Sequence, residues 1–291
     1  MNDAFSKCHP AVNFLFFAGA IGCSVVIQHP VYLITGVLCG GVYYMLLHGR
    51  KGWKMLLGLL PMFLILAVIN PLFNTYGAHI LFFVFGRPYT LEALLYGAAI
   101  AAVFAQMILW FGCYNAVMTS DKFTSLFGNR IPALSLLLVM VLRLIPNFIR
   151  KTKQIIGARK SIGKGTAEQS TTKEKLLDGM TVLSTLTDWA LEGSVVTGDS
   201  MRARGYGTAT RSSFMIYRMR SGDWLLIVAL PTLLALVITA ACLGQMAAVF
   251  TPEIQVAPIS WGILPFTAYL MTPVALHTKE AFLWHISRSK I

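Results

Sequence analysis

The sequence predicts an all-α integral membrane protein with about six membrane-spanning helices and two long polar helices. Of its 291 residues, 56% are hydrophobic and only 12% are charged, and the mean hydropathy is +0.66. Several apolar runs approach twenty residues, which is the length that a helix needs to cross a bilayer. Residues 143–222 interrupt this pattern with fourteen Lys and Arg against six Asp and Glu. Because a charged side chain at bilayer depth costs several kcal/mol, this insertion is expected outside the hydrocarbon.

The first three spans are expected before the first Asn-Pro pair. Residues 11–28 and 31–47 are apolar runs, separated by Gln28-His29-Pro30, which is typical of a tight turn. After a basic loop at 50–54, a third span is expected at about 55–69. It is predicted to stop at Asn70-Pro71, because the residue before a proline is disfavoured in helical geometry.

The stretch 71–90 is expected to be an interfacial or re-entrant segment, since its apolar piece Ile80–Phe85 is too short to cross a bilayer. A fourth span follows at about 91–118. Glu92 lies near its start and has two interpretations. It either stabilises the helix N-terminus, which is the commoner role of such a carboxylate, or takes part in a proton or ion pathway.

The apolar run 131–149 decides the topology. If it crossed the bilayer, the basic insertion would lie opposite the basic loops at 50–54 and 121–130, against the positive-inside bias. We therefore expect this run to dip into the membrane or to lie along its surface. Two last spans, at about 224–243 and 259–276, give six spans with both termini in the cytoplasm. The chain then divides into residues 1–130, 131–222 and 223–291.

Two long helices are expected within the insertion. The first continues from the 131–149 run through Pro146 to about Ile162, where Gly163 is a stop signal. The second opens at Thr171-Thr172-Lys173-Glu174, a capping-box sequence, and ends at Arg204-Gly205. Spacings of three and four predict an apolar face on this second helix, made of Leu176, Met180, Leu183, Leu186 and Ala190.

Three short motifs occupy defined places in this arrangement. Ala203-Arg204-Gly205 ends the second helix, Arg143-Leu144-Ile145-Pro146 lies in the first, and Asn70-Pro71-Leu72-Phe73-Asn74 follows the third span. In these motifs, and over nearly its whole length, the chain resembles the T component of energy-coupling factor (ECF) importers of vitamins and metal ions. That family has two long cytoplasmic coupling helices, each ending in Ala-Arg-Gly, and Arg-x-x-Pro opens the first. By this resemblance Arg143 and Pro146 mark the kink of the first coupling helix.

The first coupling-helix signature departs from the family pattern. Counted from Arg143, it is expected at Ile162-Gly163, where the arginine is absent. Arg159 and Lys160, one turn upstream, either take over its role or belong to the general positive charge of cytoplasmic loops.

The resemblance implies a non-catalytic subunit in the plasma membrane of a prokaryote, a multi-pass protein with cytoplasmic termini. Two cytoplasmic ATP-binding cassette subunits would hydrolyse ATP and each accept one helix end, and a separate membrane S component would capture the substrate. Arg204 would donate two hydrogen bonds to carboxylates of one ATPase subunit, a task suited to a planar guanidinium. Gly205 would let the chain turn away after Ala203, and Arg202 would add charge at the rim.

No catalytic, metal or cofactor site is expected in the chain itself. Its six histidines show no paired ligand spacing, and the sequence has no phosphate-binding loop, so ATP would be used by the partner subunits. Cytoplasmic loops explain the net positive charge better than nucleic-acid binding does. A self-contained secondary transporter or channel is the alternative function, although the spans lack buried charges and no inverted repeat is evident. A membrane-embedded enzyme is a third class, without any acid-base constellation to support it.

Overall fold

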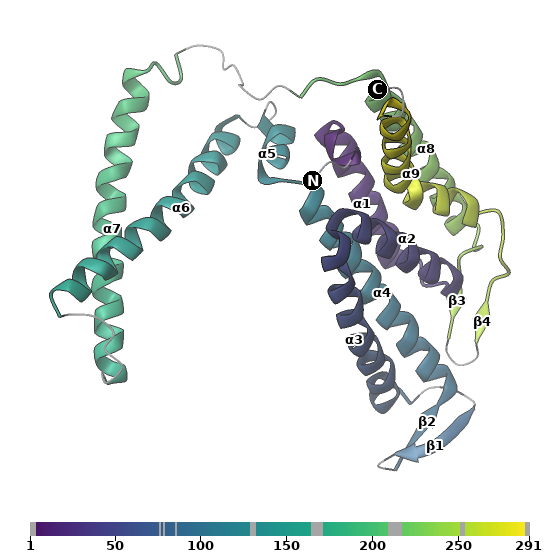
Figure 1. The fold of residues 1–291 in the computed structure, drawn as a ribbon. Helices are drawn as coiled ribbons and strands as arrows, with labels where there is room; N and C mark the ends of the chain where they lie inside the picture. The colour runs from purple at the N-terminus through teal and green to yellow at the C-terminus, as the bar shows by residue number, and fades with distance from the viewer. Residues whose placement is uncertain are drawn as a thin grey trace. The chain divides into compact units, whose positions relative to one another are not determined.

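The structure is a computed structural model that describes residues 4–75, 77, 79–84, 86–128, 132–163, 171–208, 217–250 and 254–288. Regular structure within these residues is nearly all helical, as the sequence predicts, and the strands form short antiparallel ribbons. The elements (Figure 1) follow one another as η1 (Phe5–Lys7), α1 (Pro10–Val26), α2 (Pro30–His48), η2 (Gly49–Lys51), α3 (Gly52–Phe73), β1 (Ile80–Val84), β2 (Arg87–Thr90), α4 (Leu91–Val117), α5 (Ser120–Gly128), α6 (Pro132–Ser161), α7 (Thr172–Ala203), α8 (Ser221–Cys242), β3 (Ala248–Val249), β4 (Gln255–Val256) and α9 (Ile263–Arg288).

The chain divides into two compact units. The first, here called the bundle, comprises Met1–Phe123 and Tyr217–Ile291 and contains α1 to α4, α8 and α9. The second, here called the inserted unit, comprises Thr124–Ile216 and contains α6 and α7. The two boundaries between these units lie a few residues before the boundaries predicted at 131 and 223.

Three helical segments of the described chain are long and apolar enough to cross a membrane. They are Pro30–Phe73, Leu91–Val117 and Ser221–Cys242. The first of them contains both α2 and α3, and Gly49 begins the short turn η2 between these helices with a φ of +56°. The apolar helix α1 is shorter. These helices indicate a helical membrane protein.

Aromatic side chains join helices that are distant in sequence at the centre of the bundle. Phe16 of α1 lies 5.6 Å from Trp110 of α4 and 5.3 Å from Tyr269 of α9, measured between ring centroids, and all three side chains are buried. The hydroxyl of Tyr269 donates to the carbonyl oxygen of Phe16 over 2.9 Å. A buried tyrosine of this kind combines a large apolar contact with a satisfied polar atom, so it fixes how α9 packs on α1.

Residues 5–9 contact the two segments of the bundle that connect it to the inserted unit. Phe5 is fully buried in the aromatic core. The ammonium of Lys122, just before the inserted unit, donates to the hydroxyl of Ser6 over 3.2 Å. The backbone N–H of His9 donates to the carboxylate of Asp223, just after the inserted unit, over 3.3 Å. Residues 5–9 therefore contact both connections of the insertion.

Helix α3 is longer than predicted. It continues through Asn70-Pro71 to Phe73, and the N–H of Asn74 still donates to the carbonyl oxygen of Asn70 over 3.0 Å. The prediction that the helix stops at Asn70-Pro71 was wrong. Proline removes one backbone donor, and in the last turn of a membrane helix this loss is tolerated.

The stretch that was expected to be interfacial or re-entrant holds an antiparallel ribbon. Strand β1 pairs with β2, with Ile80 opposite Thr90 and Val84 opposite Arg87. Gly86 occupies the turn with a φ of +77°, a conformation that favours glycine. Aliphatic and aromatic residues favour an extended strand here, which the sequence analysis did not recognise.

Candidate functional site

The signature Ala203-Arg204-Gly205 forms a defined helix end. Gly205 has a φ of +74°, its N–H donates to the carbonyl oxygen of Arg202 over 2.9 Å, and the N–H of Tyr206 donates to that of Met201 over 3.1 Å. This pair of bonds is the Schellman motif, in which a left-handed glycine satisfies the last carbonyl groups of a helix. The sequence therefore specifies both the end of α7 and the direction in which the chain leaves it.

The side chains of this helix end point into open surroundings. Arg202, Ala203 and Arg204 are all exposed, and neither arginine forms an ion pair within the part of the chain that the structure describes. A guanidinium offers five N–H donors in a planar fork that matches a carboxylate or a phosphate. This end of α7 can therefore bind an acidic surface without first breaking an internal ion pair.

Helix α6 also ends at a left-handed glycine, but with different side chains. Gly163 has a φ of +73°, and its N–H donates to the carbonyl oxygen of Lys160 over 3.1 Å. When the two terminating glycines are aligned, Ile162 takes the place of Arg204 and Lys160 the place of Arg202. The side chain of Ile162 is 71% exposed, and Lys160 is also exposed. The position that aligns with Arg204 therefore carries an exposed apolar side chain, that of Ile162.

Arg159 has a different environment from Lys160. Its guanidinium lies 2.5 Å from a carboxylate oxygen of Asp178 in α7, and both side chains are less than one-third exposed. The structure therefore places Arg159 between α6 and α7, whereas Lys160 remains at the helix end. From the sequence alone Arg159 and Lys160 are equivalent, because nothing in the local sequence shows which residue of α7 faces Arg159.

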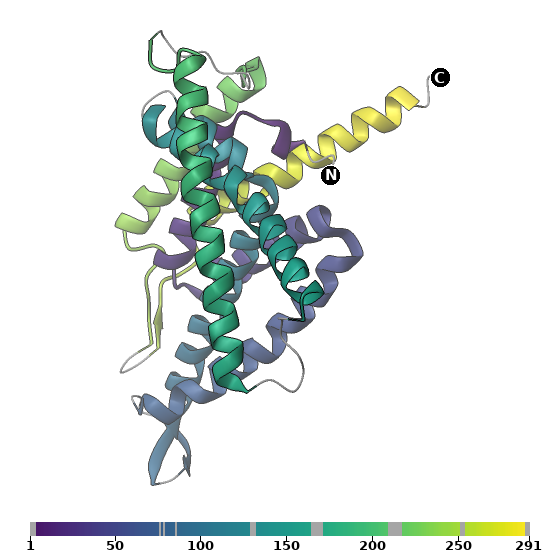
Figure 2. The ribbon, with the colours of Figure 1, turned by 90° about the vertical axis from the view of Figure 1, so that its left-hand side faces the viewer.

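A second cluster joins α6 and α7, the paired helices of the inserted unit (Figures 1 and 2). The ring of Phe148 lies edge-on to that of Trp189, with centroids 5.7 Å apart, and the ammonium of Lys151 lies 5.6 Å from the Trp189 centroid. Such a cation–π contact is worth about 0.5–1 kcal/mol at a partly exposed site. Together with Arg159 and Asp178, these residues set the pairing of two antiparallel helices.

The predicted apolar face of α7 is only partly the face that packs. Leu186 is buried and Ala190 is partly buried, but Leu176, Met180 and Leu183 are more than 60% exposed. The packed face is rotated toward Asp178 and Trp189, because the ion pair and the aromatic contact decide the orientation. An apolar strip of α7 is left without a partner in the described chain.

The proposed kink residues lie inside an uninterrupted helix. α6 runs through Pro146, which supplies no N–H to the helix, and both Arg143 and Pro146 are exposed.

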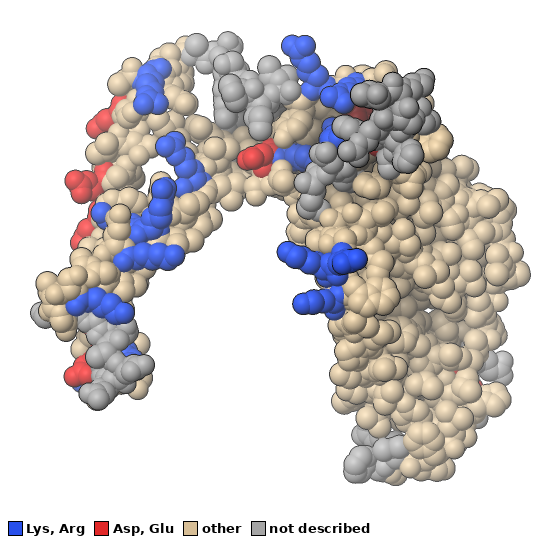
Figure 3. All heavy atoms as spheres, viewed as in Figure 1, with Lys and Arg blue, Asp and Glu red and all other residues tan. Residues whose placement is uncertain are grey.

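On the face of the inserted unit that Figure 3 shows, Lys and Arg gather over α6, and Asp and Glu lie along α7.

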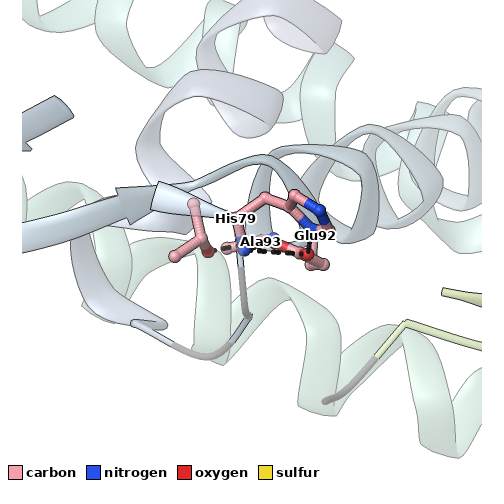
Figure 4. A network of polar contacts seen from close by, with 4 residues as sticks. His79, Glu92 and Ala93 are labelled. Carbon is pink, nitrogen blue, oxygen red and sulfur yellow. Dashed lines mark hydrogen bonds and ion pairs between the residues drawn. The ribbon is translucent and has the colours of Figure 1, made fainter. Parts of the chain in front are cut away.

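Glu92 holds a loop at the far end of the bundle (Figure 4). Its carboxylate is buried and accepts from the backbone N–H of His79 over 3.1 Å, and it lies 2.7 Å from Nδ1 of the same residue. Two residues before Glu92, the hydroxyl of Thr90 accepts from the N–H of Ala93 and caps α4. These contacts support the interpretation that Glu92 stabilises the structure at the N-terminus of α4.

No metal centre is found within the described residues, where no group of three His, Cys, Asp or Glu side chains could hold an ion. The fold and these helix ends define a helical membrane protein with a separate, charged helical unit. No known protein-family model matches the sequence, and no curated protein is significantly similar to it.

Proposed function

We propose that this protein is the non-catalytic membrane coupling subunit of an ATP-driven importer of the ECF type. The observation that carries the proposal is the end of α7, where Gly205 terminates a helix of 32 residues and leaves Arg202 and Arg204 exposed. A helix of this length extends about 48 Å, which is longer than a bilayer is thick. Such an exposed, charged end is suited to binding a partner surface.

In this proposal α1, α2, α3, α4, α8 and α9 each cross the membrane. The turn η2 separates α2 from α3, and α1 extends about 26 Å, close to the thickness of the hydrocarbon layer. Arg50, Lys51 and Lys54 make the end of the bundle at η2 basic, whereas the stretch between α8 and α9 contains no Lys or Arg. The basic end would face the cytoplasm of a prokaryotic cell.

The inserted unit would act as the coupling domain. Two ATP-binding cassette subunits would bind the ends of α6 and α7, and the exposed apolar strip of α7 would contact a membrane S component that captures a vitamin or metal ion. Leu176, Met180 and Leu183 are exposed apolar side chains on one face of α7. An exposed apolar strip of this kind favours a partner with an apolar surface, such as a membrane protein.

The two helix ends would bind unlike surfaces. Arg204 offers a fork of donors to carboxylates, whereas Ile162 offers an exposed apolar side chain near the ammonium of Lys160. This difference supports two non-equivalent docking grooves in the ATPase pair.

Co-expression with candidate ATPase and S subunits tests the proposal. The chain should co-purify with two ATPase subunits, and substrate uptake should need all components together with ATP. The purified chain alone should neither bind nor hydrolyse ATP, because it has no phosphate-binding loop. Turnover that persists after contaminating ATPases are removed would overturn the proposal.

A self-contained transporter or channel is the second candidate. Polar side chains inside the bundle favour it: the amide of Gln106 donates to the hydroxyl of Ser24 over 2.8 Å, and both side-chain polar atoms of buried Asn13 have no hydrogen-bond partner among the described residues. Substrate flux through the purified chain alone in liposomes would support this alternative, whereas flux only with ATPase subunits would exclude it.

A further inference from the structure

The β1–β2 ribbon exposes an unusual amount of apolar surface. Ile80, Leu81 and Phe82 are each about half exposed, and Phe83 is 68% exposed. This exposed apolar surface belongs to β1, because Tyr89 and Thr90 of β2 are buried. A two-stranded ribbon is marginally stable in water, and one that exposes so much apolar surface requires a covering medium.

The ribbon is nevertheless firmly attached to the bundle. The hydroxyl of Tyr89 donates to the carbonyl oxygen of Val68 in α3 over 3.2 Å, and the ring of Phe82 stacks on that of Tyr89 at 4.6 Å. At its base the buried carboxylate of Glu92 binds His79. Gly77 passes so close that a Cβ there would lie 2.4 Å from a Glu92 oxygen. The ribbon is therefore held at one place rather than extending freely.

The lipid-facing side of α3 leads directly to this ribbon. Leu64, Val68 and Leu72 are exposed at a spacing of four residues along α3, so they form one apolar strip. The strip ends at the turn before β1, and β1 carries no charged residue. Tyrosine and tryptophan are enriched at the interface between lipid and water, and β2 contributes Tyr89 to the ribbon.

The depth of the ribbon follows from its backbone. The outer edges of a two-stranded ribbon carry unpaired N–H and C=O groups, and such edges are not found in the hydrocarbon core. Lipid ester groups and water can satisfy them at the level of the headgroups.

We propose that the β1–β2 ribbon lies in the interfacial layer of the bilayer, with Phe82 and Phe83 against lipid. The ribbon belongs to the end of the bundle opposite the basic turn η2, because α3 joins the two. The inference requires only that the bundle spans a membrane, so it can fail without affecting the proposed coupling role, and the coupling role can fail without affecting it.

Spin labelling of the full chain in lipid nanodiscs tests this inference. A nitroxide is attached to Phe83→Cys in a chain whose five native cysteines are replaced. Leu64→Cys on α3 gives a hydrocarbon control, and Lys175→Cys at the exposed start of α7 gives a control in water. The collision rates of each label with oxygen and with a water-soluble nickel chelate report its depth.

The label at position 83 should favour oxygen over the chelate several-fold more than the label at position 175, and less than the label at position 64. A ratio equal to that at position 175 would overturn the inference. If the label at position 83 became protected from the chelate only when partner subunits were added, the ribbon would be a protein-docking surface. A ratio equal to that at position 64 would contradict the interfacial depth.

Discussion

At the scale of single residues, the surroundings of the basic side chains separate their roles. Arg204 is exposed at a helix end and has no ion-pair partner among the described residues, whereas Arg159 contacts Asp178 between two helices. The first can bind a partner, and the second stabilises the unit that presents it. The two arginines should therefore respond differently to substitution.

Arg204→Ala should weaken binding of one ATPase subunit. Losing one member of a buried charge pair at an interface costs about 2–5 kcal/mol, which corresponds to a loss of affinity of roughly thirty-fold or more. Arg204→Lys should restore binding only in part, because lysine lacks the planar fork. Co-purification of the ATPase with each variant measures this effect, and Lys173→Ala at the other end of α7 is the matched control. Full recovery of the ATPase with Arg204→Ala would show that the signature does not dock.

Arg159→Ala should act through the α6–α7 contact instead. A partly exposed ion pair contributes roughly 0.5–1 kcal/mol, so its loss should raise amide hydrogen exchange along the facing turns of both helices. Asp178→Ala should have a similar effect, and the double variant should be less than additive. Lys160→Ala is the control, since Lys160 is exposed and lies outside the contact. Additive effects of the two single substitutions would contradict a direct interaction.

At the scale of elements, local signals in the sequence predicted the helices of the inserted unit well. The N–H of Thr171 donates to the carboxylate of Glu174 over 3.0 Å as the capping box requires, and Gly163 and Gly205 follow the ends of α6 and α7. Each of these features depends on residues within one turn of each other. The sequence therefore sufficed to place them.

Features that depend on distant residues were not predicted. The rotation of α7 is determined by Asp178 and Trp189, whose partners lie on another helix. The ribbon at residues 80–90 forms only when two short strands pair, and neither strand has a clear alternating pattern. The continuation of α3 past Pro71 is another case, since surrounding helices compensate for the lost backbone bond.

The N-terminal element η1 gives a prediction at this scale. Phe5 is fully buried, and its ring lies 5.1 Å from that of Phe16. Phe5→Ala should destabilise the bundle by about 3–5 kcal/mol, the usual cost of removing a buried aromatic ring. Phe5→Leu should cost distinctly less, because it preserves most of the volume. Thermal unfolding in nanodiscs compares the two, and an unchanged midpoint with Phe5→Ala would contradict this packing.

At the scale of the whole molecule, the distribution of charge separates the two ends of the bundle. The turn between α2 and α3 carries Arg50 and Lys51, Lys54 follows in the first turn of α3, and the stretch between α8 and α9 contains no Lys or Arg. The connections to the inserted unit contain Lys122 and Arg220, and residues 5–9 bind both of these connections. The basic turn and the insertion are therefore expected on the same side of the membrane.

Cysteine labelling in intact cells tests this topology. With the native cysteines replaced, Lys175→Cys on α7 should resist a membrane-impermeant maleimide until the cells are permeabilised, because the positive-inside bias retains the basic insertion in the cytoplasm. Leu243→Cys, at an exposed position just after α8, should react in intact cells, since α8 carries the chain to the opposite side. An even number of crossings between the insertion and the C-terminal end of α9 would keep that end cytoplasmic as well. Labelling of Lys175→Cys from outside would place the inserted unit beyond the reach of cytoplasmic ATPases and would exclude the coupling function.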